Sequence, residues 1–126
     1  MKTLVSSALA LALTFGAALA QTPAPAATGQ TAKGEALVND KRMTLYTFDR
    51  DAPAKSNCNG QCATNWPPLA APASAQATGE WSVVTRDDGS KQWAYKGKPL
   101  YAWVNDKQPG DTTGDGVQSV WHIAKP

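Results

Sequence analysis

The sequence predicts an all-β protein in which two tandem pseudo-repeats of antiparallel strands pack into one small, aromatic-cored domain. First, the chain aligns with itself at one constant offset, the one that places Tyr46 on Tyr101, and this register holds without a gap. Second, both copies contain short runs of β-branched and aromatic residues separated by turn residues. Third, no segment beyond Ala20 shows the periodicity of a helix over several turns. We therefore expect at most one short helical turn, near residues 60–65.

The repeat is evident from an ordered series of identical or similar residues, several of them rare aromatics. The matched pairs are Gly34 with Gly89, Lys41 with Lys96, Leu45 with Leu100, Tyr46 with Tyr101, Phe48 with Trp103, Asp51 with Asp106 and Trp66 with Trp121. Chance does not produce so long an ordered set, so internal duplication is the better explanation. One face of each strand around the tyrosine is aromatic, and neither copy alone is large enough to bury it. We expect the copies to pack together about a pseudo-two-fold axis.

The strands follow from local pattern and turn chemistry. The expected strands are residues 81–86, 92–95 and 99–104 in the second copy and residues 35–38 and 43–48 in the first. Turns are expected at residues 87–90, 96–98 and 39–41. Pro99 is tolerable only at the start of its strand.

Residues 1–20 have the parts of a secretory signal peptide: Lys2, an apolar run over residues 4–19, and small residues at Ala18 and Ala20. We expect cleavage near Ala20 and a periplasmic or secreted product. The apolar run is shorter than the roughly 20 residues of a membrane-spanning helix. We interpret residues 21–33 as a flexible Pro/Ala/Thr linker, and residues 34–126 as a single domain whose repeats cover about 34–70 and 81–126.

Cleavage would remove Lys2 and no acidic residue, so the formal charge would fall from +2 to +1. Nucleic acids require a basic surface, and this balance argues against them as partners. The expected partner is an unknown envelope component or protein, with no membrane span.

The sequence also resembles a known family. Residues 45–51 (Leu-Tyr-Thr-Phe-Asp-Arg-Asp) and 100–106 (Leu-Tyr-Ala-Trp-Val-Asn-Asp) are similar to the Tyr-x-[Phe/Trp/Tyr]-x-x-Asp signature of bacterial lipoproteins and secreted repeats of unknown function. Residues 58–62, 66–69 and 109–111 match its pattern as well. The resemblance implies export and duplication but names no reaction. Many members carry a lipobox cysteine, whereas this chain has Ala20-Gln21 at the predicted cleavage point, so no lipid anchor is expected.

Cys58 and Cys62 are the only cysteines, and an oxidising compartment favours a disulfide between them that ties the loop. The alternative is a periplasmic copper-binding or thiol-redox protein, because thiolates favour Cu(I). His122, the only histidine, and Met43 are the further candidate metal ligands. Without copper, no cofactor is expected. His122 as an exposed strand residue and Met43 as a core residue are the competing interpretations.

Asp51 and Asp106 each follow the motif tyrosine at the same distance in the chain. They are expected to fix turns by accepting hydrogen bonds from backbone amides or from a tyrosine hydroxyl. A hydrolase using both carboxylates is the weakest hypothesis, since one histidine would have to serve any catalytic set. Residues 111–116 carry oxygen ligands and glycines but lack calcium-loop spacing, so a turn is expected.

The motif residues that recur in both copies are interpreted as scaffold: Tyr46, Phe48, Asp51, Trp66, Tyr101, Trp103, Asp106 and Trp121. Most aromatic rings should be buried because aliphatic residues are few, and Trp81 is the ring most readily expected to be exposed. The sequence thus favours a non-enzymatic binding or envelope module. Any function should lie where the copies differ, in the Cys58 to Cys62 loop and in residues 110–116.

Overall fold

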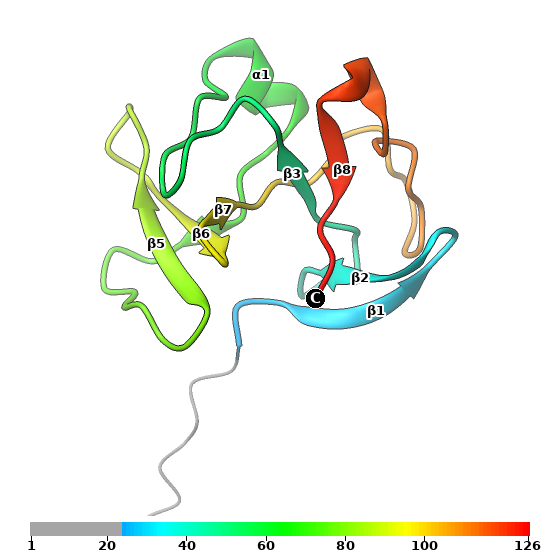
Figure 1. Ribbon diagram of the computed structural model, residues 1–126, viewed down its shortest axis with the longest axis horizontal. Coiled ribbons are helices and arrows are strands. Elements are labelled where there is room, and N and C mark those ends of the chain that lie inside the picture. The colour runs from blue at the N-terminus through cyan, green and yellow to red at the C-terminus, as the bar shows by residue number, and fades with distance from the viewer. Residues whose placement is uncertain (1–23) are drawn as a thin grey trace, which may run out of the picture.

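The computed structural model describes residues 24–126, and the predicted signal peptide lies outside the described residues (Figure 1). Strands dominate, and helix is confined to one short α-helix and one 3-10 turn within the described range, so the all-β prediction is confirmed. In chain order the elements are β1 (Ala27–Thr31), β2 (Gly34–Val38), β3 (Tyr46–Phe48), α1 (Gln61–Asn65), β4 (Ala70–Ala71), β5 (Trp81–Thr85), β6 (Lys91–Tyr95), β7 (Lys98–Pro99), η1 (Val117–Ser119) and β8 (Trp121–Ile123).

Three small antiparallel sheets make up the described part of the chain. One is the β1–β2 hairpin, the second pairs β3 with β8, and the third has the order β4-β6-β5 with β7 also paired to β6. The β1–β2 and β5–β6 hairpins lie toward opposite ends of the longest axis, with β3 and β8 between them (Figure 1). The β3–β8 pairing joins the first repeat to the second, so the repeats share a sheet rather than forming separate units.

A pseudo-two-fold axis passes between the two motif tyrosines. The Tyr46 N–H donates to the Tyr101 carbonyl at 2.8 Å, and the Tyr101 N–H donates to the Tyr46 carbonyl at 3.0 Å. We call two residues repeat mates when they are separated in the chain by the same offset as these tyrosines. More distant bonds obey the same relation, since Asp49 N–H binds the Val120 carbonyl, and the repeat mates of these two residues, Val104 and Asn65, form the equivalent bond.

Most of the strands and turns expected from the sequence are present. β5 and β6 form the predicted hairpin, and α1 lies at the predicted helical turn. The turn between β6 and β7 consists of Lys96 and Gly97, with φ of 51° and 82°, the left-handed pair that suits a tight hairpin. The predicted strand over 99–104 is shorter, because beyond β7 its pairing continues only as bridges from Tyr101 to Tyr46 and Pro68.

The strand pairing of the two copies does not follow one constant offset throughout. Ala27 pairs with Val38, whereas Ser82, the repeat mate of Ala27, pairs with Ala94, which lies one position beyond the repeat mate of Val38. The longer turn at residues 86–90 causes this shift of the second strand. The following loop compensates, because the partner of Val38 on its other side is Thr44, the partner of Ala94 is Pro99, and Thr44 and Pro99 are again repeat mates. The second copy thus has a longer first turn and a shorter second loop than the first copy. The two differences cancel, so the sequence alignment shows neither of them.

The predicted linker over residues 21–33 is wrong for Ala27–Thr31, which forms β1 and pairs along its whole length with β2. Its sequence, Ala-Thr-Gly-Gln-Thr, lacks the apolar alternation of a half-buried strand. The pairing depends on backbone hydrogen bonds and on the tight turn before Gly34, where φ is 95°. The folded domain therefore includes Ala27 and does not begin at Gly34.

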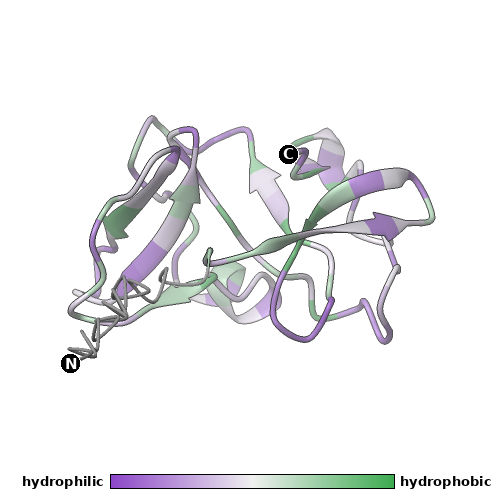
Figure 2. Ribbon diagram, turned by 90° about the horizontal axis from the view of Figure 1, so that it is seen from below, coloured by the Kyte–Doolittle hydropathy of each residue, from purple (hydrophilic) through white to green (hydrophobic). Residues whose placement is uncertain are grey.

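Two buried clusters form the core of the described part of the chain. The larger contains Tyr46, Tyr101, Trp66, Trp121, Cys58, Ala36 and Ile123, and the smaller contains Leu37, Leu45, Leu100 and Ala124. Buried and less buried residues alternate along β6 and β8, as half-buried strands require, and hydrophobic and hydrophilic residues are mixed along the ribbon (Figure 2). Trp81 was expected to be exposed but is partly buried, because it packs against the smaller cluster and against Tyr95 at 4.9 Å between ring centroids.

Candidate functional site

The tyrosine of each Tyr-x-aromatic-x-x-Asp motif forms a hydrogen bond with the aspartate of the motif in the other repeat. Tyr46 Oη donates to Asp106 Oδ2 at 2.6 Å, and Tyr101 Oη donates to Asp51 Oδ2 at 2.7 Å. The second oxygen of each carboxylate accepts a backbone N–H, from Asn57 for Asp51 and from Thr113 for Asp106. Each aspartate thus ties its own loop to the motif tyrosine of the other copy.

Burial governs the protonation of these groups. Burial, with the Asp106 carboxylate as acceptor, raises the pKa of Tyr46 well above its usual value. Burial and Asp51 likewise raise the pKa of Tyr101. Burial also raises the pKa of Asp51, against the opposing effects of the Asn57 N–H and the Tyr101 hydroxyl. Both phenols consequently remain donors through the physiological pH range.

Four aromatic rings form a continuous stack centred on the pseudo-two-fold axis. Trp66 and Trp121 lie face to face, 3.7 Å apart between centroids and only 2° from parallel. Phe48 stacks outside Trp121 at 4.2 Å, and Trp103 stacks outside Trp66 at 3.9 Å. Tyr46 meets the edge of Trp66 in the same way that Tyr101 meets the edge of Trp121. All six motif aromatics therefore belong to one inter-repeat packing unit.

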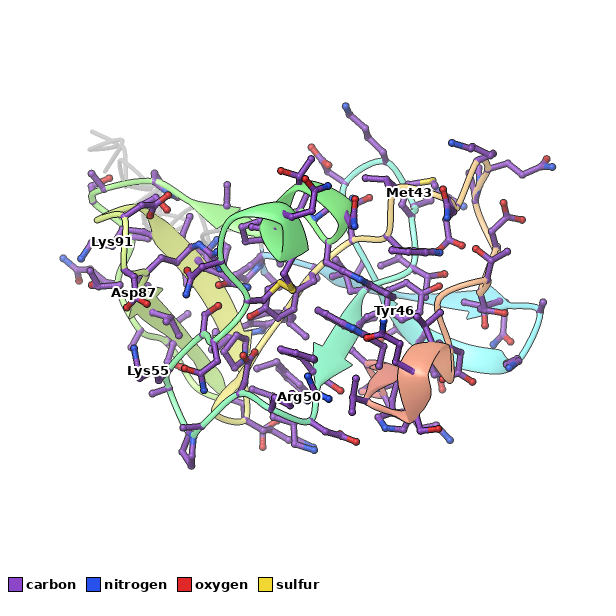
Figure 3. All side chains as sticks on the ribbon, turned by 90° about the horizontal axis from the view of Figure 1, so that it is seen from above. Met43, Tyr46, Arg50, Lys55, Asp87 and Lys91 are labelled. Carbon is purple, nitrogen blue, oxygen red and sulfur yellow. A yellow bond between two sulfur atoms is a disulfide. The ribbon has the colours of Figure 1, made fainter. Side chains whose placement is uncertain are left out.

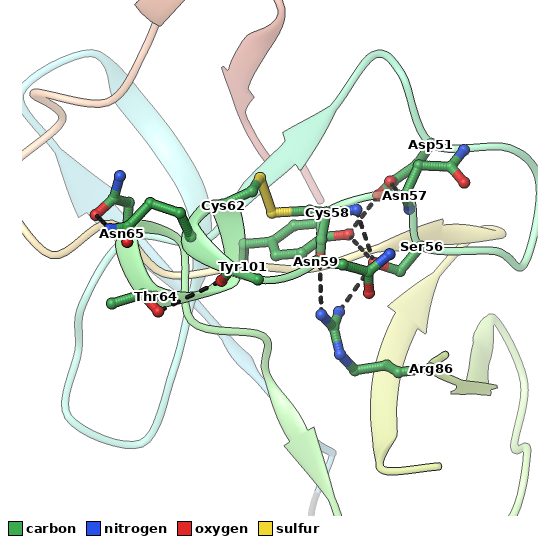
Figure 4. Close-up of a disulfide and its surroundings, with 12 residues drawn as sticks. Asp51, Ser56, Asn57, Cys58, Asn59, Cys62, Thr64, Asn65, Arg86 and Tyr101 are labelled. Carbon is green, nitrogen blue, oxygen red and sulfur yellow. Dashed lines mark hydrogen bonds between the residues drawn. A yellow bond between two sulfur atoms is a disulfide. The ribbon is translucent and has the colours of Figure 1, made fainter. Parts of the chain in front are cut away.

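Cys58 and Cys62 form the predicted disulfide, with their Cα atoms 5.2 Å apart (Figure 4). Cys58 is fully buried, and Cys62 packs against the larger core cluster. The repeat mate of Cys62 is Val117, which packs against the same cluster. In the second copy Asp106 holds the corresponding loop by accepting from both the N–H and the hydroxyl of Thr113.

Arg86 supports the disulfide loop and was missed by the sequence reasoning. Its side chain is 5% exposed and donates to the Cys58 carbonyl at 2.5 Å, the Ser56 hydroxyl at 2.9 Å and the Gln92 amide oxygen at 2.7 Å. Ser56 in turn binds the Tyr101 hydroxyl, so the arginine reaches the Tyr101–Asp51 pair through one side chain (Figure 4). The alternation that buries Val84 points Arg86 inward too, and that periodicity could have identified it.

The candidate metal ligands do not come together. Both sulfurs are committed to the disulfide, and His122 is exposed on β8, where Nε2 bonds Asp49 Oδ2 at 2.8 Å. Strand alternation turns His122 outward because its neighbours Trp121 and Ile123 are buried. Met43 lies apart from the disulfide (Figure 3). Within residues 24–126 no three His, Cys, Asp or Glu side chains are grouped to hold a metal ion.

The other candidate acidic groups also bind protein atoms. Asp51 and Asp106 bind different tyrosines and do not bond each other. In the 111–116 loop, Asp111 Oδ2 accepts from the Lys107 and Gln108 N–H groups, and Asp115 Oδ1 accepts from the Ile123 N–H. These bonds fold the loop onto its own backbone, as in an ordinary turn.

An open cavity of about 390 Å³ lies where the two repeats meet beside the disulfide, and we call it the inter-repeat pocket. Its lining residues are Phe48, Arg50, Asn57, Cys62, Asn65, Trp66, Gln118 and Trp121. The lining joins three rings of the aromatic stack to four side chains with hydrogen-bonding groups. Arg50, at the exit of β3, is seen in Figure 3. The geometry combines an apolar wall with several polar groups, as small-molecule sites do.

The polar half of this pocket is not duplicated. The repeat mates of Arg50, Asn57, Asn65 and Gln118 are Asn105, Thr112, Val120 and Ala63, respectively. The ring-forming residues, by contrast, have aromatic mates. The shared residues therefore build the wall, and residues present in only one copy supply its polar groups.

Gln118 has a strained backbone. Its φ is 50° and that of the next residue, Ser119, is 58°, so two adjacent non-glycine residues occupy the left-handed region. Such conformations cost free energy and are concentrated at functional positions. Neither sequence periodicity nor composition signals this strain, because Gln and Ser are ordinary at turns.

The fold and its duplicated core define a two-repeat, aromatic-cored β protein. The chain belongs to the Lipoprotein_15 family, described as a secreted repeat of unknown function, whose model matches residues 27–70 and 82–125. The bounds of the second match are the repeat mates of the bounds of the first, which agrees with the offset found in the sequence, and the first match includes β1. No curated protein and no solved structure is significantly similar to the chain. Over residues 24–126, no helix has the length and hydropathy of a membrane span.

Proposed function

We propose that the protein is a non-enzymatic binding module, exported to the periplasm or the exterior after cleavage near Ala20, that holds a saccharide of the cell envelope in the inter-repeat pocket. The signal-like segment over residues 1–20 supports export, as does the description of the family as secreted. An envelope location gives the module access to glycan polymers.

The observation that carries this proposal is the pairing of aromatic rings with unduplicated polar side chains. Sugars present apolar C–H faces, which pack against aromatic rings, and hydroxyls, which bond amide and guanidinium groups. Phe48 is the partly exposed ring at the pocket, and Gln118 offers an amide. Asn57 and Asn65 keep their other amide atoms for a ligand, since Asn57 Nδ2 donates to the Arg50 carbonyl and Asn65 Oδ1 accepts from Gln61. In residues 24–126, the side chains of Arg50 and Gln118 make no hydrogen bond or ion pair with one another or with any other residue, so both are available to a ligand.

The test is titration of the purified protein with soluble peptidoglycan fragments and with chitooligosaccharides, followed by tryptophan fluorescence and calorimetry. Trp66 and Trp121 line the pocket, so ligand entry should change the emission. Arg50→Ala and Gln118→Ala should each weaken binding, by about ten-fold for a lost hydrogen bond worth about 1.4 kcal/mol.

The matched control is Asn105→Ala, at the repeat mate of Arg50 and outside the pocket. This variant should bind saccharide like the parent protein. Binding of no saccharide, or equal losses in Arg50→Ala and Asn105→Ala, would overturn the proposed site.

A further inference from the structure

A groove lies along β3 and contains chemistry that the inter-repeat pocket does not use. Two adjoining cavities of about 280 and 360 Å³ share Thr47, Asp49, Lys96 and Lys98 in their linings. The larger continues past His122 to Lys125, and the smaller continues to Asp51. We call the shared residues together with His122 and Lys125 the lysine groove. Thr47 and His122 are paired neighbours on β3 and β8, and His122 is exposed whereas its neighbours on β8 are buried in the core.

The carboxylates of this groove are already engaged. Asp49 is bonded to His122 at 2.8 Å, and Asp51 accepts both the Tyr101 hydroxyl and the Asn57 N–H at 2.7 Å. Neither aspartate forms a salt bridge with a lysine within the described chain.

The ammonium groups, in contrast, are almost unneutralised. Lys98 and Lys125 form no ion pair with any residue between 24 and 126, and Lys96 meets only Glu80, at 3.9 Å on an exposed surface. An exposed pair at that distance contributes little. Three lysines therefore border one groove without committed acidic partners, and His122 adds a fourth nitrogen donor when it is protonated.

Most of these groups are absent from the equivalent face of the molecule, where Lys41 is the repeat mate of Lys96 but Met43 is that of Lys98. The repeat mates of Thr47, Asp49, His122 and Lys125 are Ala102, Val104, Pro67 and Ala70. Val104 is exposed there, at 40%. A scaffold requirement would act on both faces, so a polar and charged set of which only Lys96 has a charged mate indicates a separate use.

From this arrangement we propose that the lysine groove is an anion site that binds a phosphate group. A phosphate carries one to two negative charges at neutral pH and several strong acceptor oxygens, which match several lysines and a histidine better than a single carboxylate would. Asp49 holds the His122 ring in place through Nε2, which leaves the other ring nitrogen for the ligand. The phosphate is either free in solution or part of an anionic lipid headgroup; a phosphodiester headgroup carries one negative charge, and both present anionic non-bridging oxygens to the lysines.

The test compares the purified protein with two probes: inorganic phosphate, measured by calorimetry, and vesicles of phosphatidylglycerol in phosphatidylcholine, measured by co-sedimentation against phosphatidylcholine alone. Binding to phosphate identifies the free anion, and binding to the anionic vesicles alone identifies the headgroup. In either case Lys98→Ala/Lys125→Ala should weaken binding by about ten-fold, since two exposed charges are removed from the groove.

Lys41→Ala/Lys107→Ala is the matched control, because it removes the same charge from exposed lysines outside the groove. It should leave binding nearly unchanged. Equal losses in the two double variants would reduce the effect to net charge and overturn the site, as would failure of both probes to bind. Saccharide titration of the Lys98→Ala/Lys125→Ala protein should be normal, which separates this result from the fate of the inter-repeat pocket.

Discussion

Trp66 and Trp121 stack face to face at 3.7 Å, and they are the same residue of two copies of one unit. Each ring is nearly inaccessible, with 4% and 2% of its residue surface exposed. The contact therefore joins the repeats through the largest side chains available to a core with few aliphatic residues. Substitutions near these rings are expected to act on the stability of the whole domain.

Gly114 provides the sharpest test of that packing. A Cβ atom there would lie 2.8 Å from Trp66 Cη2, 2.9 Å from Trp66 Cζ3 and 3.0 Å from Tyr46 Cε1. Since rings of a central stack cannot retreat easily, Gly114→Ala should lower the free energy of unfolding by about 1 to 3 kcal/mol. Urea unfolding would measure it, with Asn59→Ala at the exposed repeat mate as the control, expected within about 0.5 kcal/mol of the parent.

The crossed tyrosine–aspartate bonds should be energetically coupled. Tyr46→Phe leaves Asp106 Oδ2 without its donor in a buried site, so it should destabilise the protein by about 1 to 3 kcal/mol. A double-mutant cycle with Asp106→Ala, which removes the acceptor, isolates the pair. Tyr95→Phe is the control, because in residues 24–126 no hydrogen bond of its hydroxyl is found. A coupling energy near zero would show that the bond does not hold the copies together.

Alkaline pH should unfold the protein through the same tyrosines. Their pKa values are raised by burial in the folded state, whereas the unfolded chain has the ordinary value of 10.0. The stability contribution is therefore fully present below the unfolded pKa and is lost as the pH rises above it toward the folded values. Urea unfolding at a series of alkaline pH values should show this fall, and Tyr46→Phe/Tyr101→Phe should flatten it. An equally steep fall in the double variant would assign the effect to other groups.

The disulfide should contribute mainly to stability. Closing the short loop between Cys58 and Cys62 restricts the unfolded chain by about 2 kcal/mol. Cys58→Ser/Cys62→Ser should lose that amount in urea unfolding. Mass spectrometry of the exported protein should find the pair oxidised. A reduced pair that binds Cu(I) with high affinity would instead favour the copper-binding alternative.

Substitution of Gln118 should raise the stability of the fold and lower its affinity for saccharide. Glycine adopts its left-handed conformation without steric penalty, so Gln118→Gly should stabilise the fold by up to about 1 kcal/mol while weakening saccharide binding. Thermal unfolding and the titration described above measure the two effects. If both stability and binding fall, the strain at this position has no functional cause.

Much of the fold could be predicted from the sequence because aromatic residues and turn residues are position-specific. The repeat offset and the β5–β6 hairpin were predictable for that reason. Strand β1 was not, since Ala27–Thr31 pairs through its backbone and has no apolar face to signal it.

The candidate sites were less predictable. A Tyr-x-aromatic-x-x-Asp motif is the same whether its tyrosine bonds the aspartate of its own copy or that of the other. Only the antiparallel contact of Tyr46 with Tyr101 makes each tyrosine bond the aspartate of the other copy. Similarly, Gln118 and Arg50 line one pocket only because folding brings together segments that are far apart in the chain.

The exchange of tyrosine and aspartate also has an evolutionary consequence. A gene encoding a single copy would give a chain that completes neither bond by itself, and two such chains would have to associate as a symmetric homodimer. In that dimer every substitution appears twice. Fusion of the copies into one gene removes this constraint, so Arg50 and His122 can stand on one side of the axis while Asn105 and Pro67 stand on the other. In this chain, duplication thus allows the two copies to differ around a shared scaffold.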